Sequence, residues 1–318
     1  MDRIFDKLLI SFVVLNVVSF GHSANALPAP NSNLVRPDDQ IDETALITKE
    51  SRVPRSPDEL GELESSQGRV WCFTKKNVPT QFSNRNKLRN TFTFLCNGNL
   101  IIDKDVVVLN RHNFVKMDGH KTNVRPEDCF FEHVASGEFI RFKKVQYEPY
   151  EYVPSDNYLD YYLKDFALAQ LEREPSKAPA TPIAVEDMEM SEQLYTRSTP
   201  LTVISNYAQN YKQNSKSPLD ARETPTTTSC MARLQIVSNG AGLPTHVYFT
   251  DCNTGLGSSG SLVLAEMNGK KKPVGIIVGE KHLKKPGSGF DPASLITIVT
   301  QFDTFIMDLY KELKGESI

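Results

Sequence analysis

A glycine- and serine-rich stretch, Thr254–Leu264 (TGLGSSGSLVL), could serve either of two unrelated chemistries. As a GxGxxG pattern through Gly255, Gly257 and Gly260, it would cradle a pyrophosphate with backbone N–H groups and a helix N-terminus. As GSSGS, it would expose Ser259 on a sharp turn, where a serine hydroxyl can act as a nucleophile beside backbone N–H donors. Such runs also form plain turns, so the surrounding sequence has to decide.

The phosphate interpretation needs a strand before the glycines, and a full helix and a second strand after them, within about 30 residues. After Gly260 there is only a short, mostly apolar run, 261–266, before the hairpin dipeptide Asn268–Gly269. This leaves no room for a helix of three turns. The sequence therefore argues against a dinucleotide site.

A serine nucleophile needs a histidine to take its proton and a carboxylate to hold that histidine. His112 follows an apolar run in DVVVLNRHNF, and a histidine at a strand end can be aimed into a cleft. Asp165 begins an apolar run in YYLKDFALAQLE and can be buried there, whereas Asp156 and Asp160 are the exposed alternatives. Taken singly, each is also an ordinary loop or turn residue. Together they predict a triad of His112, Asp165 and Ser259.

With these residues assigned, the chain resembles the chymotrypsin-fold (trypsin-like) serine endopeptidases, and most of all their bacterial glutamyl-endopeptidase-like (V8-like) branch. Three blocks carry the resemblance: TFLCNGNLIIDKDVVVLNRHNF, KDFALAQL and DCNTGLGSSGSLVL. They follow one another in the order His, Asp, Ser, which is the order of this fold, whereas subtilisins and α/β-hydrolases order the same groups differently. The resemblance covers the chain from about residue 70 to its C-terminal helix.

The resemblance implies that the chain hydrolyses peptide bonds through an acyl-enzyme intermediate. Ser259 would attack the scissile carbonyl, His112 would act as general base and then general acid, and Asp165 would orient the imidazole. The backbone N–H groups of Gly257 and Ser259 would form the oxyanion hole, and a glycine suits position 257 because a tight turn can require a positive φ. The implied partner is a protein or peptide substrate. No cofactor or metal is implied, and the sequence has no CxxC motif or Cys/His cluster with the spacing of a zinc site.

The primary substrate pocket is harder to predict. The position of aspartate in trypsin-like enzymes falls on Asn253, so a preference for Lys or Arg is unsupported, although Asp251 is close. A glutamyl preference usually recruits a histidine from the later strand, and residues 276–278 offer none. By the resemblance, the residues that wall the pocket are Asn253, Thr254, Ile277, Val278 and Gly279.

Five cysteines in an exported chain predict two disulfides and one free thiol. Cys230 and Cys252 bracket a strand just ahead of the nucleophile loop, so we expect them to pair. Cys72 would then pair with Cys129, although four cysteines allow three connectivities. Many members of the family bridge the cysteine before the histidine strand to one just after the histidine. Here an asparagine occupies that second place, which predicts that Cys96 is the free thiol.

Short β-type runs separated by turn residues dominate the chain from about residue 70 onward, which predicts an all-β fold. The resemblance implies two packed, six-stranded antiparallel barrels at about 67–180 and 181–300. At the end, apolar residues recur at helical spacing and predict a helix at about 301–314 whose apolar stripe packs on the core. Residues 206–229 are expected to form an exposed loop. The expected strands include 91–95, 100–102, 106–109, 139–145, 200–204, 232–237, 246–250, 261–264 and 273–278.

The first 26 residues have the pattern of a secretory signal peptide, with Arg3 and Lys7, an apolar run at 8–20 and the cleavage site Ala24-Asn25-Ala26. The apolar run is shorter than the roughly 20 residues that span a bilayer. We therefore expect a secreted or periplasmic protein that is free of the membrane once it is cleaved after Ala26. Residues 27–66 are proline-rich and acidic, which predicts a flexible leader or pro-segment, or alternatively a strap ordered across the domain.

A formal net charge of −3 with dispersed Lys and Arg argues against a nucleic-acid partner. We expect a monomer. Arg55–Ser56 and Arg69–Val70 are two candidate processing sites, and Cys72, two residues beyond the second, argues against cleavage there. There are two alternatives to an exported serine endopeptidase. A catalytically silent homologue would use the same fold to bind proteins, and it stays open. A serine esterase of another fold would show GxSxG, but the fifth position here is Ser261 and the triad order differs.

Overall fold

The structure of the 318-residue chain is a computed structural model. The predicted signal peptide, the Arg55–Ser56 bond, Asp156, Asp160 and Asn253 lie outside the residues that it describes. The described residues are 52–54, 66–73, 78, 92–116, 119–148, 162, 165–178, 199–206, 226–237, 246–252, 254, 257–267, 269–282, 295–302 and 304–316.

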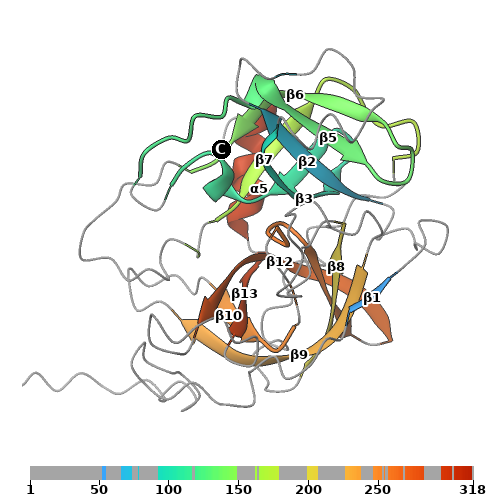
Figure 1. The fold of residues 1–318 in the computed structure, drawn as a ribbon, viewed down its shortest axis with the longest axis vertical. Helices are drawn as coiled ribbons and strands as arrows, with labels where there is room; N and C mark the ends of the chain where they lie inside the picture. Colours follow the sequence, from blue (N-terminus) through green and yellow to red (C-terminus); the bar gives the residue numbers. More distant parts are fainter. Residues whose placement is uncertain are drawn as a thin grey trace, which may run out of the picture. The chain divides into compact units, whose positions relative to one another are not determined.

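The first barrel closes on itself. Its antiparallel strands follow one another in the order β2-β3-β4-β7-β6-β5, and β5 pairs back with β2 (Figure 1). Along β6, Ile140 and Phe142 are buried while Arg141 and Lys143 are exposed, as expected for a strand with one face to the solvent. The strands are β2 (Gln67–Phe73), β3 (Phe92–Asp103), β4 (Val106–Leu109), β5 (Cys129–His133), β6 (Phe139–Gln146) and β7 (Ala167–Leu171).

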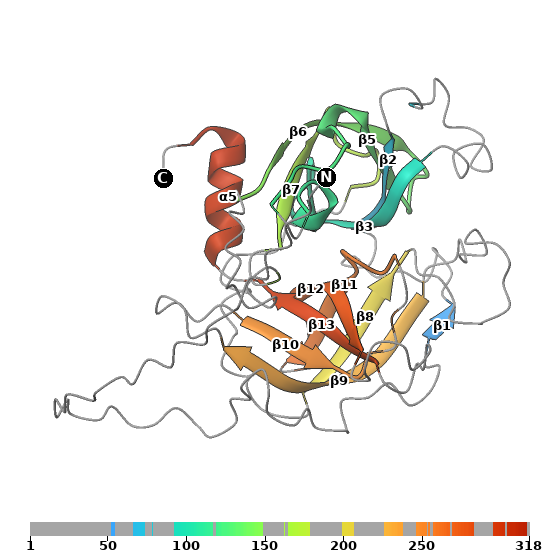
Figure 2. The same cartoon turned by 60° about the vertical axis from the view of Figure 1, so that its left-hand side comes forward.

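The second half is a curled, seven-stranded antiparallel sheet with the order β1-β9-β10-β13-β12-β11-β8 (Figure 2). The first part of β9 also pairs with β8, and its later part pairs with β10. The strands other than β1 therefore follow the order β8-β9-β10-β13-β12-β11, which matches the order of the first barrel. The strands are β1 (Arg52–Pro54), β8 (Pro200–Ser205), β9 (Thr226–Val237), β10 (His246–Thr250), β11 (Leu262–Met267), β12 (Lys270–His282) and β13 (Leu295–Gln301).

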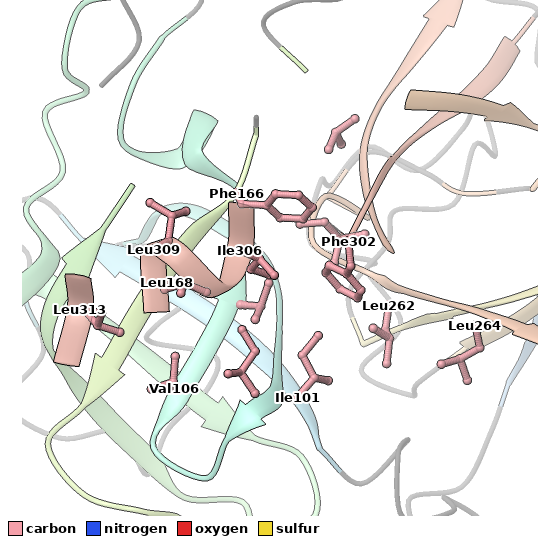
Figure 3. Close-up of a cluster of buried hydrophobic side chains, with 14 of the residues drawn as sticks. Ile101, Val106, Phe166, Leu168, Leu262, Leu264, Phe302, Ile306, Leu309 and Leu313 are labelled. Carbon is pink, nitrogen blue, oxygen red and sulfur yellow. The ribbon is translucent and has the colours of Figure 1, made fainter. Parts of the chain in front are cut away.

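One hydrophobic cluster joins both halves to the C-terminal helix α5 (Thr304–Lys314). In it, the rings of Phe166 and Phe302 lie 5.6 Å apart (Figure 3). Burying one such large apolar side chain contributes about 1.5–3 kcal/mol, so this cluster stabilises the contact between the two halves. It includes Ile101, Val106 and Leu168 of the first barrel, Leu262 and Leu264 of the second sheet, and Ile306, Leu309 and Leu313 of the helix.

These elements confirm the predicted all-β fold with a C-terminal helix whose apolar stripe packs on the core. The first half is the predicted six-stranded barrel, whereas the second half is a curled sheet to which β1 adds a seventh strand. No helix in the described part of the chain is both long and apolar enough to cross a membrane.

A polar cluster ties α5 to the turn between β3 and β4. Lys314 Nζ lies 2.9 Å from Asp103 Oδ2 and 2.8 Å from Asp105 Oδ1, and the Tyr310 hydroxyl donates to Asp103 Oδ2 at 2.8 Å. Burial opposes the ionisation of Asp103, but the hydrogen bonds from Lys314 and Tyr310 outweigh it and hold the pKa of Asp103 below its ordinary value. Burial and the neighbouring Asp103 raise the pKa of Tyr310 to about 12.

Strand β3 corrects the prediction of two separate strands at 91–95 and 100–102. It runs without a break through Asn97, Gly98 and Asn99, which read as a turn in the sequence. A Cβ at Gly98 would lie 2.6 Å from Val107 Cγ1 and 2.8 Å from Val70 Cγ2. The glycine is therefore required by close packing between neighbouring strands rather than by a turn.

The predicted exposed loop at 206–229 is wrong at both of its ends. Asn206 is buried, and Thr226–Ser229 belong to β9, where β-branched threonines suit a strand. Within the predicted leader, Arg52–Pro54 form β1 and pair with Thr226–Thr228, so these three residues follow the ordered-strap alternative.

The Arg69–Val70 bond is also unsuited to processing. Both residues are buried in the middle of β2, which pairs with β3 on one side and with β5 on the other. Arg69 Nη1 lies 3.2 Å from Glu132 Oε2 in a buried ion pair. A protease must take hold of an exposed, extended segment, so cleavage here would require the barrel to open.

Both expected disulfides are present. Cys72 pairs with Cys129, joining β2 to β5, and Cys230 pairs with Cys252. Cys96 is the free thiol and is buried. Burial is the main reason that the pKa of the Cys96 thiol lies well above its usual range, with the nearby Asp165 adding to the effect.

Candidate active site

Two neighbouring strands of the first barrel bring His112 and Asp165 together. Strands β4 and β7 pair in register, with Leu109 opposite Ala167. His112 lies in the short 3-10 turn that follows β4, Arg111–Asn113, and Asp165 precedes β7 by two residues. Because the end of β4 and the start of an antiparallel β7 lie side by side, the two side chains meet at one end of the barrel.

The carboxylate of Asp165 holds both the backbone and the ring of His112. The His112 backbone N–H donates to Asp165 Oδ1 at 2.8 Å, and Nδ1 donates to Oδ2 at 2.6 Å. The Asp165 side chain is 0% exposed, whereas the His112 side chain is 24% exposed. With its proton on Nδ1, the imidazole keeps Nε2 as a base.

Asn110 is a third member of this group that sequence reasoning missed. Its Nδ2 donates to Asp165 Oδ2 at 3.3 Å and to the Asp165 carbonyl at 3.4 Å. Asn110 is fully buried, and its Oδ1 has no partner among the described residues. A Cβ at Gly260 would lie 3.5 Å from this Oδ1, so Asn110 lies between the His112–Asp165 pair and the glycine loop.

The loop around Ser259 is a tight turn that depends on two glycines. Gly257 has a φ of 87° and Gly260 a φ of 80°, values that residues with a side chain rarely adopt. The N–H of Ser261 donates to the Ser258 carbonyl at 2.9 Å and closes the turn. Ser259 is half-exposed at its tip, as the nucleophile interpretation of this stretch predicts.

Strand β3 of the first barrel donates hydrogen bonds to carbonyl groups of this loop. The Asn97 N–H donates to the Ser259 carbonyl at 2.9 Å, and Asn97 Nδ2 donates to the Gly257 carbonyl at 3.0 Å. Two residues along the strand, Asn99 Nδ2 donates to the Gly260 carbonyl at 2.7 Å. Asn97 and Asn99 were not selected from the sequence. Their i, i+2 spacing in an otherwise apolar strand could have identified them, because this spacing places both side chains on one face of the strand.

Two backbone donors of the loop are not used. Within the described part of the chain, the N–H groups of Gly257 and Ser259 have no acceptor, whereas Gly260 N–H donates to the Ile277 carbonyl at 2.8 Å. Among the same residues, the Ser259 hydroxyl makes no hydrogen bond with His112. Among the described residues, two N–H groups of the loop, one on either side of Ser258, thus have no acceptor and lie next to the partly exposed Ser259.

The residues predicted to wall a substrate pocket are only partly described, and Asn253 lies outside them. The hydroxyls of Thr254 and Thr297 lie 2.9 Å apart, and Thr297 Oγ1 also donates to the Cys252 carbonyl at 2.8 Å. Ile277 and Val278 are buried. A Cβ at Gly279 would lie 3.5 Å from the hydroxyl oxygen of Tyr162, which had not been predicted at this position. Of these residues, Ile277 contacts the glycine loop directly: its carbonyl accepts from Gly260 N–H at 2.8 Å, and its N–H donates to the Ser261 carbonyl at 3.0 Å.

No metal centre is apparent in the described segments, where no three His, Cys, Asp or Glu side chains gather as a metal ion would need.

Comparison with known proteins identifies the fold. A structure described as "Structure of Glu endopeptidase in complex with MPD" aligns with a TM-score of 0.50 and 11% identity, over 85% of this chain and 100% of that one. A thermostable serine protease, AL20, from an extremophilic microorganism aligns with a TM-score of 0.47 and 13% identity, over 81% of this chain and 100% of that one. No family model matches the sequence, and no curated protein matches it. The chain therefore has the trypsin-like double-barrel fold found in serine endopeptidases.

Proposed function

We propose that this double-barrel protein is a serine endopeptidase that uses Ser259, His112 and Asp165. The observation that carries the proposal is the buried Asp165 carboxylate, which accepts two hydrogen bonds from His112 at 2.6 and 2.8 Å. A carboxylate that fixes the tautomer of a part-exposed histidine is the arrangement that general-base catalysis requires. The fold, shared with a Glu endopeptidase, supports the same conclusion.

Hydrolysis would proceed in two halves. Ser259 Oγ bonds to the scissile carbonyl carbon while its proton passes to His112 Nε2, and the carbonyl π electrons move onto oxygen. The tetrahedral intermediate then collapses, the C–N bond breaks, and His112 gives its proton to the leaving amine. A water molecule, deprotonated by His112, attacks the acyl-enzyme in the same way and releases the acid and the free serine.

The free N–H groups of Gly257 and Ser259 would stabilise the oxyanion of each intermediate. Donors that already point at the developing charge need no reorganisation during the reaction, and each contributes about 10²–10³ in kcat. Because Gly257 has a φ of 87°, a substituent there would strain the backbone that presents one of these donors.

A fluorophosphonate probe tests the nucleophile directly. We expect covalent labelling of the wild-type protein, with the adduct located on Ser259 by mass spectrometry. Ser259→Ala should abolish labelling and His112→Ala should slow it, because the serine then has no base. Ser229→Ala, on the exposed side of β9, is the matched control and should label like the wild type. Labelling that survives Ser259→Ala would exclude the proposed nucleophile.

The second candidate is a catalytically silent homologue that binds proteins through the same fold. It is favoured by the Ser259 hydroxyl, which makes no hydrogen bond to His112 within the described residues. Such bonds are often loose before substrate binds, so this observation is weaker than the ordered Asp165–His112 pair. If a folded wild-type protein neither reacts with the probe nor cleaves denatured casein, the binding role replaces the enzyme.

We also propose that the protein is exported as a monomer. The signal-peptide pattern of residues 1–26 and the two disulfides both suit an oxidising compartment. Expression of the full chain in a secreting host should release a protein whose N-terminus, read by mass spectrometry, is Leu27 or lies later in the leader. A product that keeps Met1 would exclude cleavage of the signal peptide.

A further inference from the structure

The side chain of Asn97 is placed to hold the loop that carries Ser259. It is 1% exposed and lies on β3, in the first barrel, although the loop belongs to the second half of the chain. Asn97 Nδ2 donates to the carbonyls of Gly257 at 3.0 Å and of Ser259 at 3.3 Å, and the Asn97 N–H donates to the Ser259 carbonyl at 2.9 Å. Asn97 thus holds the carbonyls of Gly257 and Ser259, the two residues whose N–H groups have no acceptor among the described residues.

The orientation of this amide is determined by its other end. Asn97 Oδ1 accepts the backbone N–H of Asn206 at 2.7 Å. Only an oxygen can accept that hydrogen, so the NH₂ group must face the two carbonyls of the loop. The Asn206 carbonyl in turn accepts Arg69 Nε at 2.9 Å, and Arg69 forms the buried ion pair with Glu132. The anchor is therefore held by a continuous buried chain of polar contacts.

The hydrogen bonds from Asn97 are needed because Gly257 is conformationally free. Gly257 lacks a side chain and has a φ of 87°, so its own backbone preferences do little to fix its conformation. Oxyanion donors contribute most when they are preorganised, and small displacements of such groups have large effects on rate. Fixing the Gly257 and Ser259 carbonyls restricts the rotation of the backbone on both sides of Ser258.

We propose that Asn97 is a positioning residue that holds the Gly257 and Ser259 N–H groups in the geometry required by the transition state. This inference rests on the proposed function, and it assigns to the first barrel a role in the oxyanion hole besides the acid–base pair. Asn97 does not touch the reacting atoms, so it acts on kcat and not on the binding of the ground-state substrate.

Asn97→Asp is the sharpest variant. The variant keeps the shape of the side chain and an oxygen that can accept from the Asn206 N–H. It also places a second oxygen, instead of the donating NH₂ group, against the Gly257 and Ser259 carbonyls. We expect kcat to fall on the order of 10²-fold, with KM changed by less than about 3-fold. The affinity for a peptidyl boronate, which forms a tetrahedral adduct on the serine, should weaken by a similar factor of about 10².

Two further variants test whether the effect comes from the lost hydrogen bonds or only from the added charge. Asn97→Ser removes the donors without adding charge and serves if Asn97→Asp does not fold, as judged by near-UV circular dichroism. Asn123→Asp introduces the same charge at an exposed asparagine and is the matched control, expected to leave kcat and boronate affinity unchanged. A rise in KM with kcat unchanged in the Asn97 variants would overturn the proposal.

Hydrogen–deuterium exchange measures the anchoring without any need for catalysis. We expect peptides that cover 254–264 to exchange faster in the Asn97 variants than in the wild type or in Asn123→Asp, because the loop opens more readily. Unchanged exchange would overturn the anchoring role even in an active enzyme. Faster exchange in a protein that is inert to the probe and to casein would uphold the anchor while excluding the peptidase function.

Discussion

The two halves of the molecule share a strand order but contribute to the candidate site in different ways. In the first barrel, the ladder between β4 and β7 sets His112 against Asp165, so this hydrogen-bonded pair is fixed by contacts within one half. The second half contributes the Ser259 loop, whose carbonyls are held by Asn97 and Asn99 from the other half. The His112–Asp165 pair is thus positioned by the register of β4 and β7, whereas the Ser259 loop is positioned by the interface between the two halves.

This difference predicts different consequences of mutation. Substitutions at the acid–base pair should change chemistry while leaving the barrel intact, because the ladder positions the pair. Substitutions at the loop should change chemistry and stability together, because the same contacts join the two halves. The first two of the four predictions that follow test this contrast at the site, and the other two concern contacts that stabilise the fold away from it.

Asp165→Asn should have the largest effect on activity. It keeps the shape of the side chain but removes the carboxylate that accepts from both His112 N and Nδ1. We expect kcat to fall on the order of 10⁴-fold at neutral pH, because the imidazole loses the partner that sets its tautomer. Peptide hydrolysis gives the rate, and thermal unfolding should show a folded protein. A loss of less than about tenfold would leave Asp165 without a role in general-base catalysis.

Gly260→Ala should break the interface. Its φ of 80° disfavours a side chain, and a Cβ there would collide with the Asn97 carbonyl oxygen. We expect a loss of about 3 kcal/mol or more in the free energy of unfolding, together with loss of probe labelling. Gly269→Ala is the matched control: its φ is 72°, but no atom of the described residues lies within 4 Å of the added Cβ, so it should cost only about 1–2 kcal/mol. Equal losses for the two variants would contradict a specific contact at Gly260.

The disulfides allow the stability of the two halves to be compared. Cys72–Cys129 closes a loop with a sequence separation of 57, and Cys230–Cys252 one of 22. On chain entropy alone, replacing both cysteines of a pair by alanine should cost about 4 kcal/mol in the first barrel and about 3 kcal/mol in the second half. Urea unfolding of the two double variants measures the difference. A larger loss from the Cys230–Cys252 pair would show that factors other than loop length dominate.

Lys314→Met should have the smallest effect. It removes the ammonium group that lies 2.9 Å from Asp103 and 2.8 Å from Asp105, at an expected cost of about 1 kcal/mol at neutral pH. Because the pKa of folded Asp103 lies below its ordinary value of 3.8, this contribution is present above that pH and is lost as the pH falls through the folded pKa. Unfolding of wild type and variant at pH 7 and pH 3 measures it. An equal difference at both values would mean that the ion pair contributes nothing.

Several features were accessible from the sequence because local pattern determines them. The apolar run before His112 marked a strand, and the helical spacing of Phe302, Ile306 and Leu309 marked a helix that packs on the core. The position of Cys230 and Cys252 just ahead of the nucleophile loop marked a disulfide. Residue types and their order also supplied the hypothesis of a His112, Asp165 and Ser259 triad. The structure supports the first two members with a hydrogen bond, and the role of all three stays a prediction.

What the sequence by itself determined was therefore the periodicity of the elements, the chemistry available to them and the order of the reactive residues. What only the tertiary structure decided was the partner of each buried polar group. The local sequence at Gly98 suggests a turn, but side chains of two neighbouring strands pack against this glycine. Arg69 has the residue type of a cleavage site, but it is buried and paired with Glu132. The physical reason is that hydrogen bonds and close contacts between residues far apart in the chain depend on how the barrels close and meet, which no local pattern records.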